Sequence, residues 1–178
     1  ARQVDTVLLD KTGTLTMNKP ILTDIVAHGP GNTRDSVLAL AAAAEALSEH
    51  PVGRAIVEAA RARGLSRRLP KVDGFKATPG MGISCTVLTV PGSGGKTKKS
   101  KVKRTTQSPL LVGTRTWLQQ NRVVIPPELG GNVASLEWQG KTVVFAAAGG
   151  VAVGALAVAD RARPEAREAV AALHRWGV

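Results

Sequence analysis

The residues best suited to chemistry in this chain form the run Asp10 to Thr16, which reads DKTGTLT. They follow the apolar stretch Val7–Leu9, which predicts a buried strand ending at Asp10. Aspartate is a competent nucleophile toward phosphoryl groups and can form an aspartyl-phosphate. The hydroxyls of Thr12 and Thr14, with the neighbouring backbone amides, can hold phosphate oxygens while Mg²⁺ neutralises their charge. We therefore expect phosphoryl chemistry at Asp10.

The same seven residues resemble the phosphorylation signature of P-type ATPases, which are ion pumps that phosphorylate themselves on that aspartate. The related haloacid-dehalogenase phosphatases carry a second aspartate two positions later, as the acid and base that hydrolyses the phosphoenzyme. This chain has Thr12 at that position. Because threonine does not titrate near neutral pH, the phosphoenzyme should persist, which suits a pump. The resemblance implies that Lys11, Thr12 and Thr14 orient Asp10, the phosphate and Mg²⁺, with Asp10 and Thr12 as the metal site.

A second group of residues lies between two predicted helices. Thr33 can cap a helix that continues to Leu47, and a second helix is predicted to begin at Pro51 and to stop near Gly64. The joint of this hairpin contains His50, which taken alone is more often a surface or capping histidine. A neutral imidazole can also lie against an adenine ring or hydrogen-bond it.

The joint reads Ser-Glu-His-Pro, and Pro-Gly-x-Gly-Ile follows it about thirty residues later. This combination resembles the nucleotide-binding domain of the heavy-metal pumps, the P1B class of P-type ATPases. The resemblance implies that Glu45 contacts the adenine amino group and that His50 binds the adenine ring. The implied ATP-binding set is Glu45, His50, Gly80, Gly82, Ile83 and Gly113. Glycines would also let a ligand approach the backbone closely, because they have no Cβ atom. Thr114 departs from the pattern, because the family commonly has asparagine after this glycine.

The rest of the chain predicts a largely antiparallel sheet covered by two helices. A short helical stretch is expected around Trp117, and turns are expected at residues 79–82, 139–140 and 149–150. The expected strands are residues 71–75, 83–87, 110–112, 133–138, 142–147 and 151–159.

After Asp160, Pro164 opens a predicted amphipathic helix with Val170 and Leu173 inward, so this end resembles a βα unit. The fold class is therefore α/β. We expect an antiparallel nucleotide-binding domain, flanked by helices, inserted in a partial haloacid-dehalogenase-like (Rossmann-like) phosphorylation domain. The expected boundaries are 1–19 for the first part of the phosphorylation domain, 20–154 for the nucleotide-binding domain and 155–178 for the return segment.

Composition fits a globular domain outside the membrane. The chain has 178 residues, of which 43% are hydrophobic, and this is enough for a sizeable core. The single cysteine, Cys85, cannot form an internal disulfide, so we expect a cytosolic location. The charged N-terminus does not fit a signal peptide. Residues 143–159 carry no charge, but Gly149 and Gly150 interrupt them, which favours a hairpin over a membrane helix.

The net charge of +11 raises the question of nucleic-acid binding. Six of the basic residues fall between Lys96 and Arg104, within residues 91–108, which we interpret as a basic flexible loop. The chain has no tyrosine and only two phenylalanines, so stacking platforms for bases are lacking. We expect no nucleic-acid partner.

The resemblance as a whole implies the ATP-binding cytoplasmic module of a copper-transporting P1B ATPase, with ATP and Mg²⁺ as cofactors. Gly53 and the insertion at 91–108 favour copper over the zinc or cadmium type, which remains the alternative together with a haloacid-dehalogenase phosphatase. The implied location is the cytosolic face of a membrane. The implied partners are ATP and the actuator and membrane domains of the same pump. We expect this piece to be monomeric and to bind ATP with negligible turnover.

Overall fold

The computed structural model describes residues 4–89 and 106–177. Their centre is one six-stranded sheet in which every neighbouring pair of strands is antiparallel. The strands are β1 (Thr16–Ala27), β2 (Lys71–Thr78), β3 (Gly82–Thr89), β4 (Thr106–Gly113), β5 (Thr142–Ala148) and β6 (Val151–Ala162). Their order across the sheet is β1-β6-β5-β4-β3-β2. The predicted α/β class with an antiparallel sheet is confirmed.

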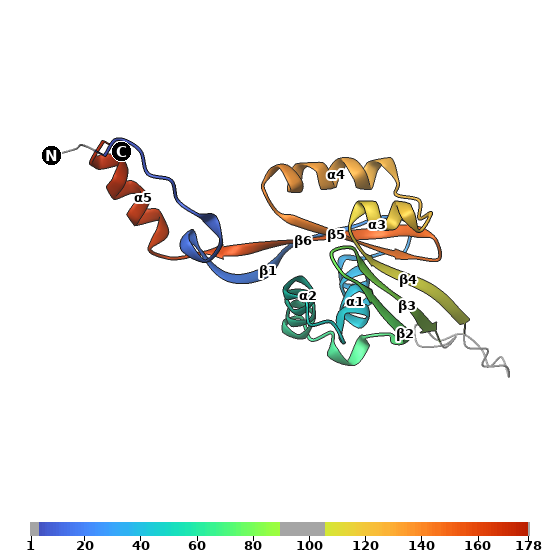
Figure 1. The fold of residues 1–178 in the computed structure, drawn as a ribbon. Coiled ribbons are helices and arrows are strands. Elements are labelled where there is room, and N and C mark those ends of the chain that lie inside the picture. Colours follow the sequence, from blue (N-terminus) through green and yellow to red (C-terminus); the bar gives the residue numbers. More distant parts are fainter. Residues whose placement is uncertain (1–3, 90–105, 178) are drawn as a thin grey trace.

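Two helices, α1 (Arg34–Glu45) and α2 (Pro51–Ala62), cover one face of the sheet (Figure 1). Side chains alternate between the two faces of a strand, so Leu110 and Val112 of β4 point to this side. They form a core with Leu38 of α1 and Ile56 of α2, and all four are fully buried. Apolar burial on this scale supplies most of the free energy that holds the helices against the sheet.

The opposite face is covered by α3 (Arg115–Gln120) and α4 (Pro127–Trp138), as Figure 1 shows. The helix predicted around Trp117 is present as α3, whereas the prediction of a strand at residues 133–138 is wrong, because these residues belong to α4. Leu129, Val133 and Leu136 follow the spacing of a helix face and are buried, and Pro127 suits the first helical turn. The window 133–138 was too short to separate helical from strand periodicity.

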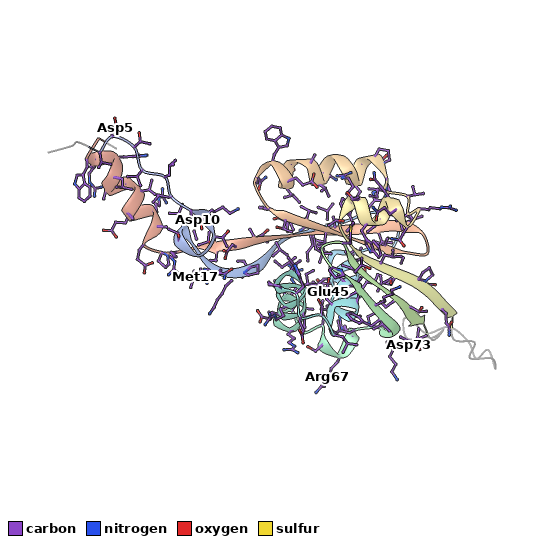
Figure 2. The ribbon with its side chains drawn as sticks, in the orientation of Figure 1. Asp5, Asp10, Met17, Glu45, Arg67 and Asp73 are labelled. Atoms are coloured by element: carbon purple, nitrogen blue, oxygen red, sulfur yellow. The ribbon has the colours of Figure 1, made fainter. Side chains whose placement is uncertain are left out.

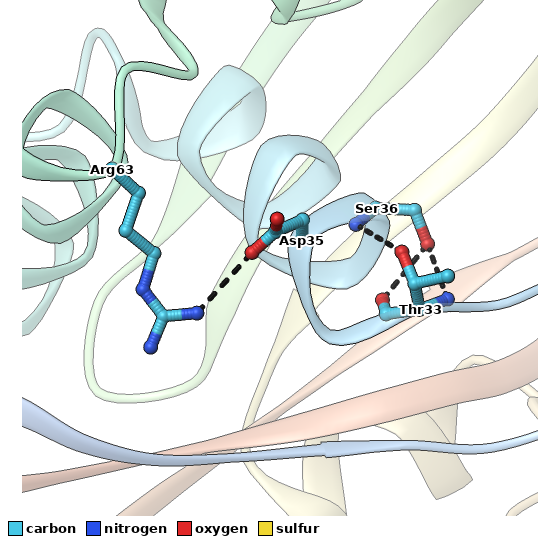
Figure 3. A network of polar contacts seen from close by, with 4 residues as sticks. All are labelled: Thr33, Asp35, Ser36 and Arg63. Atoms are coloured by element: carbon cyan, nitrogen blue, oxygen red, sulfur yellow. Dashed lines mark hydrogen bonds and ion pairs between the residues drawn. The ribbon is translucent and has the colours of Figure 1, made fainter.

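The hairpin of α1 and α2 is held by local polar contacts (Figure 3). Thr33 caps α1 as predicted: its hydroxyl accepts from the Ser36 amide at 3.1 Å, and the Thr33 amide donates to Ser36 Oγ at 2.9 Å. Arg63, which caps the end of α2, pairs with Asp35 at 3.2 Å. This pair is exposed, so it contributes little stability. The helix α1 ends at Glu45 and not at Leu47, whose side chain is exposed.

Strands β1 and β6 continue beyond the sheet body into a second lobe, where residues 4–15 lie near α5 (Ala166–Arg175). The prediction of a buried strand at Val7–Leu9 is wrong, because these residues form no strand and Leu8 is 95% exposed. An apolar segment is buried as a strand only where neighbouring strands cover it, and no described strand lies beside residues 7–9. Helix α5 has no fully buried residue, and Val170 and Leu173 are half-buried.

Two short turns complete the described chain, namely Lys11–Leu15 and Ser66–Arg68. Most of the predicted basic loop lies outside the described residues, and residues 106–108 belong to β4 instead. Among the described residues, no helix is both long and apolar enough to span a bilayer.

Candidate functional site

All six residues of the predicted nucleotide set line one cavity of about 340 Å³. Glu45 comes from the end of α1 and His50 from the start of α2, while Gly80 lies in the turn between β2 and β3. The remaining three come from the facing ends of β3 and β4: Gly82, Ile83 and Gly113. The joint of a helical hairpin and a strand turn thus face each other across a concave site.

Glu45 is the most unusual residue of this cavity. It is only 7% exposed, and its Oε2 has no hydrogen-bond partner among the described residues. Burial raises the pKa of its carboxyl group, and a hydrogen bond from Ser48 opposes that change. A buried acceptor without a donor costs free energy, which an incoming N–H group would recover. Glu45 is therefore prepared to accept a hydrogen bond from a ligand.

His50 has a structural role as well as a place in the cavity. It is the N-cap of α2, and its Nδ1 accepts from the Val52 amide at 3.2 Å. This bond fixes the plane of the ring and puts the proton of the neutral imidazole on Nε2. The side chain is exposed and lines the cavity, so one face of the ring can stack on a planar ligand.

The glycines of the cavity differ in what they leave room for. Gly80 has a φ of +70°, and a Cβ added there would meet nothing within 4 Å. Gly82 and Gly113 lie opposite each other in the β3–β4 ladder, and an added Cβ on either would lie 2.6 Å from Cδ1 of Trp117. Only at Gly80, therefore, does the missing side chain leave open space for a ligand.

Thr114 also lines the cavity, and its side chain is engaged in the fold. Its Oγ1 caps α3 by accepting from the Trp117 amide at 3.2 Å, and its own amide donates to Met81 at 2.9 Å. Asparagine is also a favourable N-cap residue, so either residue type can cap α3 at this position. The Trp117 indole Nε1 is buried and has no hydrogen-bond partner in the described part of the chain.

Sequence reasoning missed part of the cavity wall. Ser48, Val52 and Met81 flank predicted residues, so proximity in the chain could have identified them. The residues 142–144 of β5 could not be found in that way, because only the order of strands brings them to the site.

A larger hollow of about 490 Å³ lies beside the edge strand β1 and is lined by residues 23–27, Arg34, Arg63, Asn132 and Leu136. Arg63 is already paired with Asp35, and the walls hold no buried side chain without a partner. We therefore take the smaller cavity, which is lined by Glu45 with its unpartnered Oε2, as the candidate binding site.

Asp10 lies in the second lobe, apart from Glu45 (Figure 2). It is exposed, and it precedes the turn Lys11–Leu15, in which Gly13 takes a φ of +81°. Thr12 and Thr14 are exposed in the same turn. The structure therefore presents the four predicted catalytic residues together but does not bring them to the cavity.

The turn that carries Asp10 is tied to the end of β6. Thr16 is buried, and its hydroxyl contacts the Asp160 carboxylate. The Asp160 oxygens also accept from the amides of Asn18 at 3.1 Å and Lys19 at 2.8 Å. These bonds, that of Thr16 first, lower the pKa of Asp160. The Arg163 guanidinium donates to the Gly13 carbonyl at 3.0 Å, so two residues of the C-terminal strand region hold the turn.

The described residues offer Mg²⁺ only part of a site. No group of three or more acidic, histidine or cysteine residues gathers in the part of the chain that the structure describes. Mg²⁺ commonly binds one or two carboxylates and completes its shell with waters and substrate phosphates. The exposed Asp10 fits that manner of binding as one carboxylate ligand.

Comparisons with known proteins agree with the fold. Residues 4–178 match the haloacid dehalogenase-like hydrolase family, and the chain belongs to that family.

Among curated proteins, the chain is 38% identical over 178 residues to a probable copper-exporting P-type ATPase V of Mycobacterium tuberculosis, covering all of this chain and 20% of that protein. It is 39% identical over 176 residues to a copper-exporting P-type ATPase of Bacillus subtilis, covering 99% of this chain and 19% of that protein. A crystal structure of a zinc-transporting PIB-type ATPase matches with a TM-score of 0.69 and 29% identity, covering 94% of this chain and 23% of the other.

These relatives are P-type ATPases that their names describe as copper exporters or as a zinc-transporting PIB-type pump. The chain spans about a fifth of the length of the curated relatives it matches.

Proposed function

We propose that the cavity between the α1–α2 joint and the β2–β3 turn binds the adenine of ATP. The observation that carries this proposal is the buried Glu45 carboxylate, whose Oε2 has no partner among the described residues, beside the exposed ring of His50. The carboxylate accepts from the adenine amino group, and the imidazole lies against the ring. Gly80 leaves its backbone open to the ligand. A volume of about 340 Å³ is within the range of small-molecule sites. Ile83 and Gly113 form the wall at the strand ends.

Asp10 acts as the phosphoryl acceptor in this proposal. In the complete protein the triphosphate of ATP reaches the second lobe, and a carboxylate oxygen of Asp10 attacks the γ-phosphorus in line, so that the bond to the β–γ bridging oxygen breaks and ADP leaves. Lys11, Thr12 and Thr14 position the nucleophile and the phosphate oxygens. Asp10 and Thr12 contribute ligands to Mg²⁺, which supplies charge neutralisation when it is bound. Since Thr12 cannot act as a general base, the general base that hydrolyses the phosphoenzyme must come from another part of the pump.

Residues 20–154 form the nucleotide-binding domain, and residues 1–19 and 155–178 belong to the phosphorylation domain. The pairing of β1 with β6 runs across both boundaries, so these two strands connect the domains. The remaining domains of the same pump are the partners of the chain, which itself is monomeric and lies at the cytosolic face of the membrane.

The parent protein is proposed to be a copper-transporting P1B ATPase. The curated relatives named above are copper exporters, which favours copper, whereas the zinc-transporting structural neighbour keeps the zinc or cadmium type as the alternative. The presence of Gly53 and the insertion at residues 91–108 also favours copper.

Calorimetric titration with ATP tests the proposed site. The variant His50→Asn removes the aromatic ring but keeps an N-cap acceptor, so α2 should remain folded. We expect wild type to bind ATP and His50→Asn to lose most of that affinity. The matched control is His174→Asn on the exposed side of α5, which should bind like wild type. Equal affinity of His50→Asn and wild type would contradict the assignment.

Phosphate release separates the pump from a phosphatase. A pump segment should bind ATP without appreciable release of phosphate. A phosphatase would hydrolyse small phosphoesters, and Asp10→Asn would abolish that turnover.

A further inference from the structure

We propose that Gly53 is a positioning residue for the Glu45 carboxylate: because position 53 has no side chain, the carboxylate can lie against the first turn of α2 and face the cavity. This inference rests on the proposed ATP site. It adds a residue that does not line the cavity and whose effect on binding passes through Glu45.

The geometry around Gly53 is specific. Gly53 is buried in the third position of α2. A Cβ atom added there would clash with Oε2 of Glu45, the oxygen that has no partner. It would also lie 2.9 Å from Oγ of Ser48 and 3.0 Å from Cδ of Glu45. The space of one methyl group is therefore occupied by the Glu45 carboxylate and the Ser48 hydroxyl.

Backbone conformation does not explain this glycine. Its φ is not in the left-handed region, so alanine could take the same helical conformation. Glycine inside a helix is less stable than alanine by about 0.5–1 kcal/mol. Glycine therefore lowers helix stability at this position, and the three atoms nearest to the missing Cβ belong to the side chains of Glu45 and Ser48.

A methyl group at this position should act on binding more than on folding. The atom it meets first is the far end of a flexible side chain, which can rotate away, whereas the helix backbone need not move. The rotated carboxylate no longer occupies the position from which it accepts a hydrogen bond. Gly53→Ala should then retain the melting temperature of wild type or exceed it, while ATP affinity falls at least tenfold.

The experiment compares ATP titrations of wild type, Gly53→Ala, Glu45→Ala and the double variant. The control is Gly131→Ala, because Gly131 also lies in a helix and an added Cβ there meets nothing within 4 Å. Gly53→Ala should lose affinity, and Gly131→Ala should not. Since the effect passes through Glu45, Gly53→Ala should cause no further loss in the Glu45→Ala background. Wild-type affinity of Gly53→Ala, or additive losses in the double variant, would overturn the proposal.

A readout without nucleotide distinguishes failure of this inference from failure of the ATP site. The side-chain carboxyl carbon of Glu45 can be followed by NMR as a function of pH in the unliganded protein. In Gly53→Ala the displaced carboxyl gains solvent, so its pKa should fall toward the ordinary value, while Gly131→Ala leaves it unchanged. An unchanged Glu45 titration in Gly53→Ala would refute the positioning role even if wild type bound no ATP.

Discussion

Gly82→Ala tests whether the glycine pair of β3 and β4 serves packing or ligand approach. The added Cβ would lie 2.6 Å from Cδ1 of Trp117 and 2.7 Å from Cα of Gly113, and it would clash with the Val112 carbonyl. Two of these three contacts are to the backbone of β4, which is fixed on both sides by ladder hydrogen bonds. Overpacking of this kind costs about 1–3 kcal/mol, and we expect Gly82→Ala to fall in the upper half of that range.

Urea unfolding followed by far-ultraviolet circular dichroism measures this cost as a lower midpoint at an unchanged slope. Trp117→Ala should relieve part of it, so Gly82 and Trp117 should couple in a double-mutant cycle. Gly80→Ala is the contrast, because its cost arises from a φ of +70° and should show no coupling to Trp117. A Gly82→Ala midpoint equal to that of wild type, or zero coupling to Trp117, would refute the packing explanation.

Three further predictions concern single contacts. The pKa of Glu45 is raised in the folded protein, so the free energy of unfolding should fall as the pH rises from the ordinary pKa of glutamate through the raised pKa of Glu45. Urea unfolding of Glu45→Gln should lack this decrease. Asp160→Ala should speed hydrogen exchange at the amides of Asn18 and Lys19, because both donate to the Asp160 carboxylate. Unchanged exchange would show that these two bonds do not protect the amides. Gly154→Ala should lower stability by about 1–3 kcal/mol in thermal unfolding, because its Cβ would lie 2.7 Å from a buried valine of α1, and a neutral effect would contradict that packing.

Local signals predicted the parts of the fold that local contacts determine. Thr33 caps α1 and Pro51 opens α2, because capping and the fixed φ of proline act within one turn. The resemblance then identified Glu45 and His50 as neighbours across that hairpin. Their presence in one cavity follows from the short connection between the two helices.

Features that depend on distant partners could not be predicted in this way. The run Val7–Leu9 is apolar enough for a buried strand, but burial requires neighbouring strands. The roles of Gly82 and Gly113 depend on a ladder register that places them opposite each other under Trp117. The hydrophobic pattern of residues 133–138 alone also fits a strand, and the helical spacing is seen only when Pro127 and Leu129 are included.

The contact between Asp160 and Thr16 joins residues that are far apart in the chain, so it could not be predicted from the sequence around either residue. It shows how the C-terminal strand supports the turn that carries Asp10. The segment that follows the predicted nucleophile is therefore held by residues from the C-terminal part of the chain.

A map of amide chemical shifts during an ATP titration tests the central claim most directly. If ATP binds as proposed, the largest shifts should fall on residues 45–52, 78–83 and 113–114, which surround the cavity. Shifts concentrated on residues 23–27 beside the larger hollow, or no shifts at saturating ATP, would contradict the proposed nucleotide site.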